Sequence, residues 1–119
     1  MNPSRYGIEL VLDLHDCDTG KFSRDNIGFF LVQICSTIRM VPYGEPHFWE
    51  DNSGVAHLHG ISAFQFVSTS NIVVHSLTLL KAVYINIFSC RDFDVETAAK
   101  FSGDFFGTKA VRANVVERI

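Results

Sequence analysis

Between residues 46 and 90 the chain consists of short stretches rich in β-branched and aromatic residues, separated by turn residues. The predicted strands are Pro46–Glu50, Val55–His59, Ile61–Ser68, Ile72–Leu77 and Lys81–Cys90. The segment 51–54 (Asp-Asn-Ser-Gly) is predicted as a hairpin loop between the first two, and the polar triplet 69–71 is expected to separate the third and fourth. Connections this short cannot accommodate crossover helices, so the pattern requires a largely antiparallel sheet.

One helix is predicted on each side of this region. The first is expected to end near Met40, because Pro42 disfavours helix in the residue before it. Its candidate N-caps are Ser23, Asp25 and Asn26. The second is predicted over Val95–Phe106, with Asp94 as its cap and Gly107 after its end. The remaining segments, Gly7–Leu14 and Ala110–Val116, are predicted as the first and last strands.

Two helices and a mainly antiparallel sheet predict an α+β fold, a two-layer sandwich with both helices packed on one face of the sheet. The 119 residues form one domain of ordinary size, with no linker or low-complexity segment. A sheet covered on one face leaves the other face open, and eleven phenylalanines make its exposure to water unfavourable. A homodimer is therefore expected.

Charge and hydropathy exclude several classes of protein. The formal net charge is −3, whereas a nucleic-acid binder normally needs a basic face. No apolar run approaches the length of a membrane span, so Ile27–Ile38 and Leu77–Cys90 are interpreted as core elements. The first six residues contain no signal-peptide hydrophobic region, and a cytoplasmic protein is expected.

Cysteines and histidines give weak signals when taken alone. The three cysteines have no CxxC spacing, which argues against a disulfide framework or a structural zinc site. His57 and His59 stand two apart on a predicted strand and would share a face, with His47 across the hairpin. A pair without a recognisable third ligand favours polar pocket or surface residues over a metal site, and no metal is expected. His75 lies in an apolar run, where a histidine is usually a hydrogen-bonded core residue.

Four motifs together resemble the central block of the short prokaryotic S-adenosylmethionine decarboxylases. They are Gly60-Ile61-Ser62, Thr69-Ser70-Asn71, His75, and Ile87-Phe88-Ser89-Cys90. Ser62 precedes Ser70 by eight residues, His75 follows Ser70 by five, and Cys90 follows His75 by fifteen, as in the family and without a gap. The first strand with its Cys-Asp ending and the closing acidic turn, helix and strand also resemble the family, so the likeness covers nearly the whole chain.

The resemblance implies a self-processing pyruvoyl enzyme of polyamine biosynthesis. The chain would cut itself between Thr69 and Ser70, by an N-to-O acyl shift and β-elimination, into chains 1–69 and 70–119. Ser70 would become the pyruvoyl cofactor, which forms a Schiff base with the substrate amine and acts as electron sink in decarboxylation. The implied roles are oxyanion stabilisation for Ser62, a proton shuttle for His75 and protonation of the product for Cys90.

Departures from the family lie around the nucleoside. The family has Glu-Ser-His where this chain has Thr69-Ser70-Asn71, a ribose-binding glutamate where it has Leu79, and an adenine-stacking aromatic residue where it has Ala56. The missing carboxylate and the missing aromatic ring are each expected to cost about 1–3 kcal/mol of nucleoside binding. Asn71 is nevertheless retained as a candidate substrate-binding residue.

A segment about five residues longer than the family's precedes Ser62. It supplies the other candidate substrate-binding residues, which are Glu45, Trp49, Glu50 and Asp51. Carboxylates here would suit a cationic side chain, so ornithine or arginine is favoured as substrate over S-adenosylmethionine. The aromatic residues of this segment, Trp49 among them, would alternatively restore adenine stacking from a new direction. For Trp49 and the neighbouring Phe48, packing in the core under the hairpin is the competing interpretation. A non-catalytic paralogue that never cleaves, and an unrelated binding module, also remain open.

Overall fold

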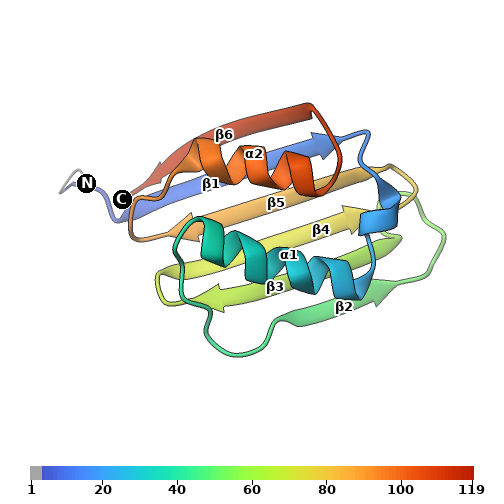
Figure 1. Ribbon diagram of the computed structural model, residues 1–119, viewed down its shortest axis with the longest axis horizontal. Coiled ribbons are helices and arrows are strands. Elements are labelled where there is room, and N and C mark those ends of the chain that lie inside the picture. The colour runs from blue at the N-terminus through green and yellow to red at the C-terminus, as the bar shows by residue number, and fades with distance from the viewer. Residues whose placement is uncertain (1–3) are drawn as a thin grey trace.

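The computed structural model describes residues 4–119, so the first three residues of the N-terminal stretch lie outside it. The elements are β1 (Gly7–His15), η1 (Thr19–Lys21), α1 (Arg24–Thr37), β2 (His47–Asp51), β3 (Gly60–Val67), β4 (Ser70–Leu77), β5 (Ala82–Ser89), α2 (Val95–Phe105) and β6 (Ala110–Arg118). The strands form one antiparallel sheet in the order β2-β3-β4-β5-β1-β6, and both α-helices cover the same face (Figure 1). This arrangement is the predicted two-layer α+β sandwich.

Alternation along the strands divides the sheet into a buried face and an open face. In β1, Leu10, Leu12 and Leu14 are fully buried under the helices, whereas the residues between them are only half-buried. The central contribution from α1 is Phe30, which stacks against aromatic rings of α2. We call the side away from the helices the open face. It is continuous across all six strands because neither helix reaches it (Figure 1).

The N-caps of both α-helices are residues that the sequence predicts as caps. Ser23 is the N-cap of α1, and its hydroxyl accepts a hydrogen bond of 3.1 Å from the Asn26 amide. Asp94 caps α2 in the same way through the Thr97 amide, at 3.0 Å. The bound amide holds the pKa of the Asp94 carboxyl below its usual range, so the cap stays charged near neutral pH.

One predicted strand is absent, and several predicted boundaries are displaced. Val55–His59 is not a strand: it forms a turn, and β2 pairs with β3 across the whole loop 52–59. The expected hairpin around 51–54 is thus a longer connection. The triplet 69–71 does not separate the strands either, because the two-residue turn is Ser68-Thr69 and β4 already begins at Ser70. In addition, α1 ends at Thr37, three residues before the expected end.

The predicted histidine pair is also wrong, as a consequence of the missing strand. His57 is exposed in the turn, and His59 Nδ1 accepts a hydrogen bond of 3.0 Å from the Gly54 amide. His47 stacks on Phe64 at 4.7 Å between ring centroids. Within residues 4–119, no three His, Cys, Asp or Glu side chains form a group able to hold a metal ion. In the same range no helix is long and apolar enough to cross a membrane.

Gly60 is expected to be essential where β3 begins. Its φ is +153°, and an added Cβ would lie 1.8 Å from the carbonyl oxygen of Ser76. Gly60→Ala should therefore lower the free energy of unfolding by about 3 kcal/mol or more, measured by urea denaturation. Gly54→Ala is the matched control: its φ is +75° but no atom lies within 4 Å, so only the backbone cost of about 1–2 kcal/mol is expected. Equal losses in both variants would contradict the steric explanation.

Candidate active site

The β3–β4 turn holds the peptide bond between Thr69 and Ser70 at one end of the sheet. Val67 pairs with Ser70 to close the hairpin, which leaves Ser68 and Thr69 as the turn. The carbonyl oxygen of Thr69 accepts a hydrogen bond of 2.9 Å from the amide of Cys90, at the end of β5. The carbonyl of the predicted scissile bond thus already has a backbone donor directed at it.

Strand register places the Ser70 side chain on the helix-covered side. Ser70 pairs with Ser89, and directly opposed residues share a face. Ser89 is buried, with its hydroxyl accepting a hydrogen bond from the Arg91 amide at 3.1 Å. Asn71, one position along β4, therefore faces the open side and pairs with Phe88.

Ser62 and His75 form a hydrogen-bonded pair on the open face. They are opposite each other on β3 and β4, and Ser62 Oγ lies 2.8 Å from His75 Nδ1. Because Ser62 occupies Nδ1, Nε2 is the nitrogen left to exchange a proton. His75 is exposed, so the interpretation of it as a core residue is wrong.

Trp49 lies beside this pair. It stands opposite Ser62 on β2, is 73% exposed, and lines a cavity of about 140 Å³ together with Ser62 and His75. Phe48 instead turns to the other face and packs against the core. Phe48 thus follows the core-packing interpretation, whereas Trp49 remains a candidate substrate-binding residue.

The two groups of predicted catalytic residues lie far apart in one chain. Ser70 and His75 are separated by five residues of extended strand, or about 16 Å. They also face opposite sides of the sheet. The Ser62–His75 pair lies toward the end of the sheet that carries the loop 52–59, and the Thr69–Ser70 turn lies at the other end (Figure 1). One subunit alone therefore does not bring the two groups together.

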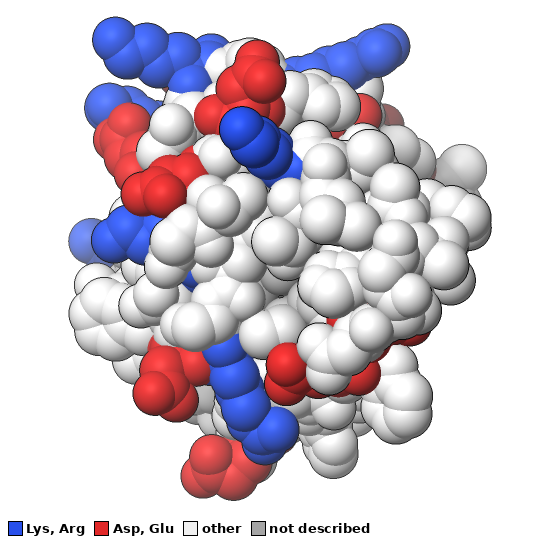
Figure 2. Space-filling model, turned by 90° about the vertical axis from the view of Figure 1, so that its right-hand side faces the viewer, with Lys and Arg blue, Asp and Glu red and all other residues white. Residues whose placement is uncertain are grey.

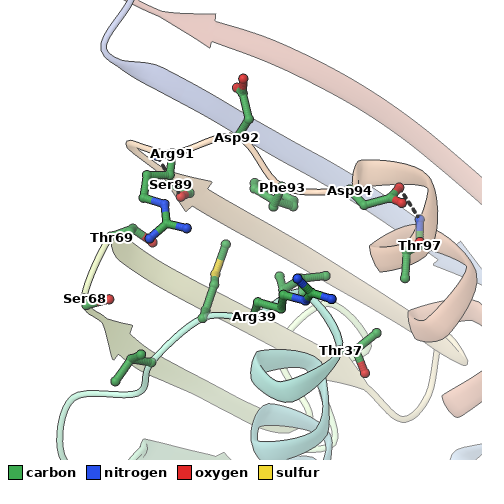
Figure 3. A pocket seen from close by; sticks show the side chains of 13 residues that line it. Thr37, Arg39, Ser68, Thr69, Ser89, Arg91, Asp92, Phe93, Asp94 and Thr97 are labelled. Atoms are coloured by element: carbon green, nitrogen blue, oxygen red, sulfur yellow. Dashed lines mark hydrogen bonds between the residues drawn. The ribbon is translucent and has the colours of Figure 1, made fainter. Parts of the chain in front are cut away.

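A cavity of about 390 Å³ adjoins the scissile turn on the helix-covered side. It lies between the end of α1, the β3–β4 turn and the segment joining β5 to α2 (Figure 3). Thr69 lines it, and the Thr69 Oγ1 atom is buried with no hydrogen-bond partner. Arg39 and Arg91 enter it from opposite sides (Figure 3). The cavity volume lies within the range of small-molecule sites.

The three cysteines differ in their surroundings. Burial raises the pKa of the Cys17 thiol to about 11 and also raises that of the buried Cys35, so neither suits proton transfer near neutral pH. Cys90 is only half-buried and lies next to the scissile turn. The protonation role predicted for Cys90 stays a prediction.

The predicted acidic substrate residues are dispersed. Glu45 is exposed before β2, whereas Glu50 and Asp51 line a cavity of about 260 Å³ at the far end of the sheet from Ser70. Asp51 accepts a hydrogen bond of 2.9 Å from the Ser53 amide. Hydrogen bonds from Ser53 hold the pKa of the Asp51 carboxyl below its usual range, so this residue carries a charge near neutral pH.

Two of the positions that depart from the family lie at that same end. Leu79 is 53% exposed in the β4–β5 turn, and Ala56 is exposed in the loop 52–59. The Thr78 amide donates to the His59 carbonyl oxygen at 3.1 Å, which joins this turn to the loop. The surface of this end has a broad uncharged middle, with charged side chains gathered above and below it (Figure 2). Neither Leu79 nor Ala56 has a side-chain hydrogen-bonding group to offer to ribose hydroxyl groups.

Arg39 and Arg91 were not predicted from sequence. Arg91 directly follows Cys90, and that adjacency was the one available signal. The position of Arg39 depends on a left-handed backbone conformation (φ +59°), and an arginine in a sequence does not predict that conformation.

Comparisons with known proteins identify the family and the fold of this chain. The family model for S-adenosylmethionine decarboxylase matches residues 8–119. Among solved structures, the adenosylmethionine decarboxylase from Aquifex aeolicus VF5 superposes with a TM-score of 0.80 at 18% identity, over 96% of this chain and 91% of that one. No curated protein matches the sequence. The chain belongs to the S-adenosylmethionine decarboxylase family, as a divergent member.

Proposed function

We propose that the chain is a self-processing, pyruvoyl-dependent decarboxylase that acts on a small basic amino acid. The observation that carries this proposal is the hydrogen bond from the Cys90 amide to the Thr69 carbonyl oxygen, 2.9 Å long. Attack of the Ser70 hydroxyl on that carbonyl places negative charge on this oxygen, where a fixed backbone donor stabilises it most. A pyruvoyl group formed at residue 70 fits the site, because a cavity of about 390 Å³ adjoins the turn.

The self-cleavage would proceed in steps that the chain's own residues supply. Ser70 Oγ bonds to the Thr69 carbonyl carbon as the C–N bond breaks, which gives an ester and a free amine. A base then removes the Ser70 Cα proton, the Cβ–Oγ bond breaks, and its electron pair leaves with Thr69 as a carboxylate. Water replaces the resulting dehydroalanine nitrogen, which departs as ammonia. The sequence is redox-neutral and needs no reagent except water.

A homodimer supplies the base. Ser70 and its own His75 face opposite sides of the sheet about 16 Å apart, so we infer that His75 acts on the turn of the other subunit. Two open faces packed against each other would bring the Ser62–His75 pair of one subunit to the turn of the other. Packing the open faces would also bury the exposed Trp49 and Phe66.

In catalysis, the pyruvoyl group supplies the electron sink that allows carbon dioxide to leave the substrate. Cys90 and Asn71 lie beside residue 70, and Cys90 would return a proton to the substrate carbon. A partly exposed thiol suits that role better than the two buried ones. Ser62 would keep the His75 ring oriented through its hydrogen bond at Nδ1.

Two features favour a basic amino acid over S-adenosylmethionine. Leu79 and Ala56 supply neither the carboxylate nor the aromatic ring with which the family binds the nucleoside. Trp49, exposed beside the Ser62–His75 pair, offers a ring face to a cationic side chain, and the charged Asp51 terminates the same strand. Glu45 and Glu50 would add negative potential around this region. Decarboxylation of S-adenosylmethionine itself is the alternative.

The proposal is tested by mass spectrometry of the purified protein under denaturing conditions. Chains of 69 and 50 residues are expected, and the shorter should be blocked at its N-terminus. Carbon dioxide release should then be faster with ornithine or arginine than with S-adenosylmethionine. A single intact chain under all conditions would instead favour the non-catalytic paralogue. Turnover of S-adenosylmethionine alone would show the substrate assignment to be wrong.

A further inference from the structure

We propose that Arg39 and Arg91 receive the carboxylate that self-cleavage creates at Thr69, and that they speed the elimination step by stabilising this leaving group. The inference rests on the proposed self-cleavage. It assigns to the helix-side cavity a second function, besides the room that it gives to a pyruvoyl group at residue 70. Both arginines line this cavity together with Thr69 (Figure 3).

The chemistry creates an anion that the uncut chain does not have. Before cleavage, Thr69 contributes one neutral carbonyl oxygen, which the Cys90 amide already binds. After elimination, Thr69 is a chain terminus with two carboxylate oxygens and a pKa of about 3.5. Its second oxygen comes from Ser70 Oγ, which the strand register places on the cavity side. That oxygen needs a new donor, and a guanidinium is the strongest one available to a carboxylate.

Both guanidinium groups are available for this carboxylate. Within residues 4–119, neither Arg39 nor Arg91 has an ion-pair partner. The two acidic residues on the cavity rim are already engaged. Asp94 caps α2, and Asp92 pairs with Arg5 at 2.6 Å. Two guanidinium groups without an ion-pair partner in the described part of the chain therefore line the cavity.

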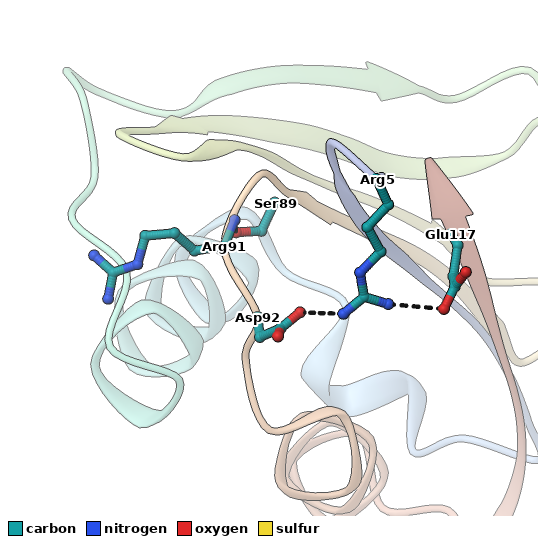
Figure 4. A network of polar contacts seen from close by, with 5 residues as sticks. All are labelled: Arg5, Ser89, Arg91, Asp92 and Glu117. Atoms are coloured by element: carbon teal, nitrogen blue, oxygen red, sulfur yellow. Dashed lines mark hydrogen bonds and ion pairs between the residues drawn. The ribbon is translucent and has the colours of Figure 1, made fainter. Parts of the chain in front are cut away.

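The ion pair between Arg5 and Asp92 also separates the roles of two neighbouring residues after β5. Asp92 anchors the segment, and Arg91 lines the cavity. Arg5 bridges Asp92 and Glu117, at 2.6 and 2.9 Å, and the side chain of Arg91 extends away from that network toward the segment after α1 (Figure 4). Anchoring Asp92 fixes the short segment between Cys90 and α2. Cys90 and Arg91, as neighbours, thus present an amide and a guanidinium to the same turn.

Arg39 reaches the cavity through an unfavourable backbone conformation. It follows α1 in the left-handed region, with φ +59°, a position usually taken by glycine or asparagine. A residue with a Cβ costs about 1–2 kcal/mol there. Strain of this kind is commonly retained where a side chain has a function. Here it accompanies a side chain that lines the cavity beside Thr69.

The test separates ester formation from elimination. Wild type, Arg39→Gln, Arg91→Gln and the double variant are made by cell-free synthesis, and samples are quenched over time. Hydroxylamine at neutral pH cleaves the ester and yields residues 70–119 with an unmodified Ser70, which mass spectrometry distinguishes from the pyruvoyl chain. The double variant should accumulate ester, with elimination slowed by about 10- to 100-fold and ester formation unchanged. Arg91→Lys should restore part of the rate.

Arg112→Gln, on the edge strand β6 away from the cavity, is the matched control and should process like wild type. Circular dichroism establishes that each variant is folded. If the double variant is not folded, the same two rates are compared in the single variants. If the double variant eliminates at the wild-type rate, or if ester formation and elimination are slowed equally, the role of the two arginines is overturned and the proposed function is not. Absence of ester and fragments in the wild-type chain overturns the proposed function, and this inference with it.

Discussion

Ser70→Ala should remain a single chain of 119 residues and release no carbon dioxide from any substrate. The alanine has no hydroxyl to attack the Thr69 carbonyl and no oxygen to eliminate, so both the cut and the cofactor are lost together. The expected effect is complete loss of activity rather than a reduced rate. Intact mass and carbon dioxide release measure the two consequences independently.

Ser68→Ala is the matched control, because Ser68 is exposed in the same two-residue turn but its hydroxyl lies on the other side of the scissile bond. This variant should process and turn over substrate at nearly the wild-type rate. If Ser70→Ala is still cut at the turn, a nucleophile other than Ser70 acts there, and the pyruvoyl assignment is wrong.

His75→Ala should also slow formation of the pyruvoyl chain, because the His75 of each subunit is proposed to act on the Thr69–Ser70 turn of its partner. Loss of a positioned acid–base residue is expected to slow processing by about 10²- to 10⁴-fold. Because the structure separates Ser70 from its own His75 by about 16 Å on opposite faces, a subunit with His75→Ala can still be served by an intact His75 in its partner. Co-expression of His75→Ala with Ser70→Ala should therefore restore one working site per mixed dimer.

Differently tagged subunits allow the mixed dimer to be purified and assayed. Each parent should be inactive, and the mixed dimer should reach up to about half of the wild-type activity. His57→Ala, which removes an exposed histidine in the loop 52–59, should leave activity unchanged. No recovery in the mixed dimer would place both groups in one subunit and contradict the dimeric site.

Much of the fold could be predicted because local signals and packing agree. Ser23 and Asp94 cap the two helices as expected, and the apolar alternation of β1, β4 and β5 assigns the covered face correctly. The predicted strand Val55–His59 is absent because strand propensity is only a weak guide. Loop hydrogen bonds at Gly54 and His59 replace the expected pairing.

The candidate site was predictable in its residues but not in its arrangement. The spacing of Ser62, Ser70, His75 and Cys90 selects the residues, but it does not say on which face each one lies. That depends on the start of β4 at Ser70, two residues earlier than the predicted start at Ile72. Arg39 could not be found, because its place in the cavity follows from one backbone angle.

The order of the strands determines when the chain can be cut. A cut after Thr69 leaves β1, β2 and β3 in one polypeptide and β4, β5 and β6 in the other. In the sheet, β1 lies between β5 and β6, so the two polypeptides are interleaved rather than side by side (Figure 1). Each half would expose unpaired strands without the other, and refolding of the cut protein would be bimolecular and dependent on concentration. If the chain is cut as proposed, folding must therefore precede processing, and the uncut chain would serve as its own template for assembly.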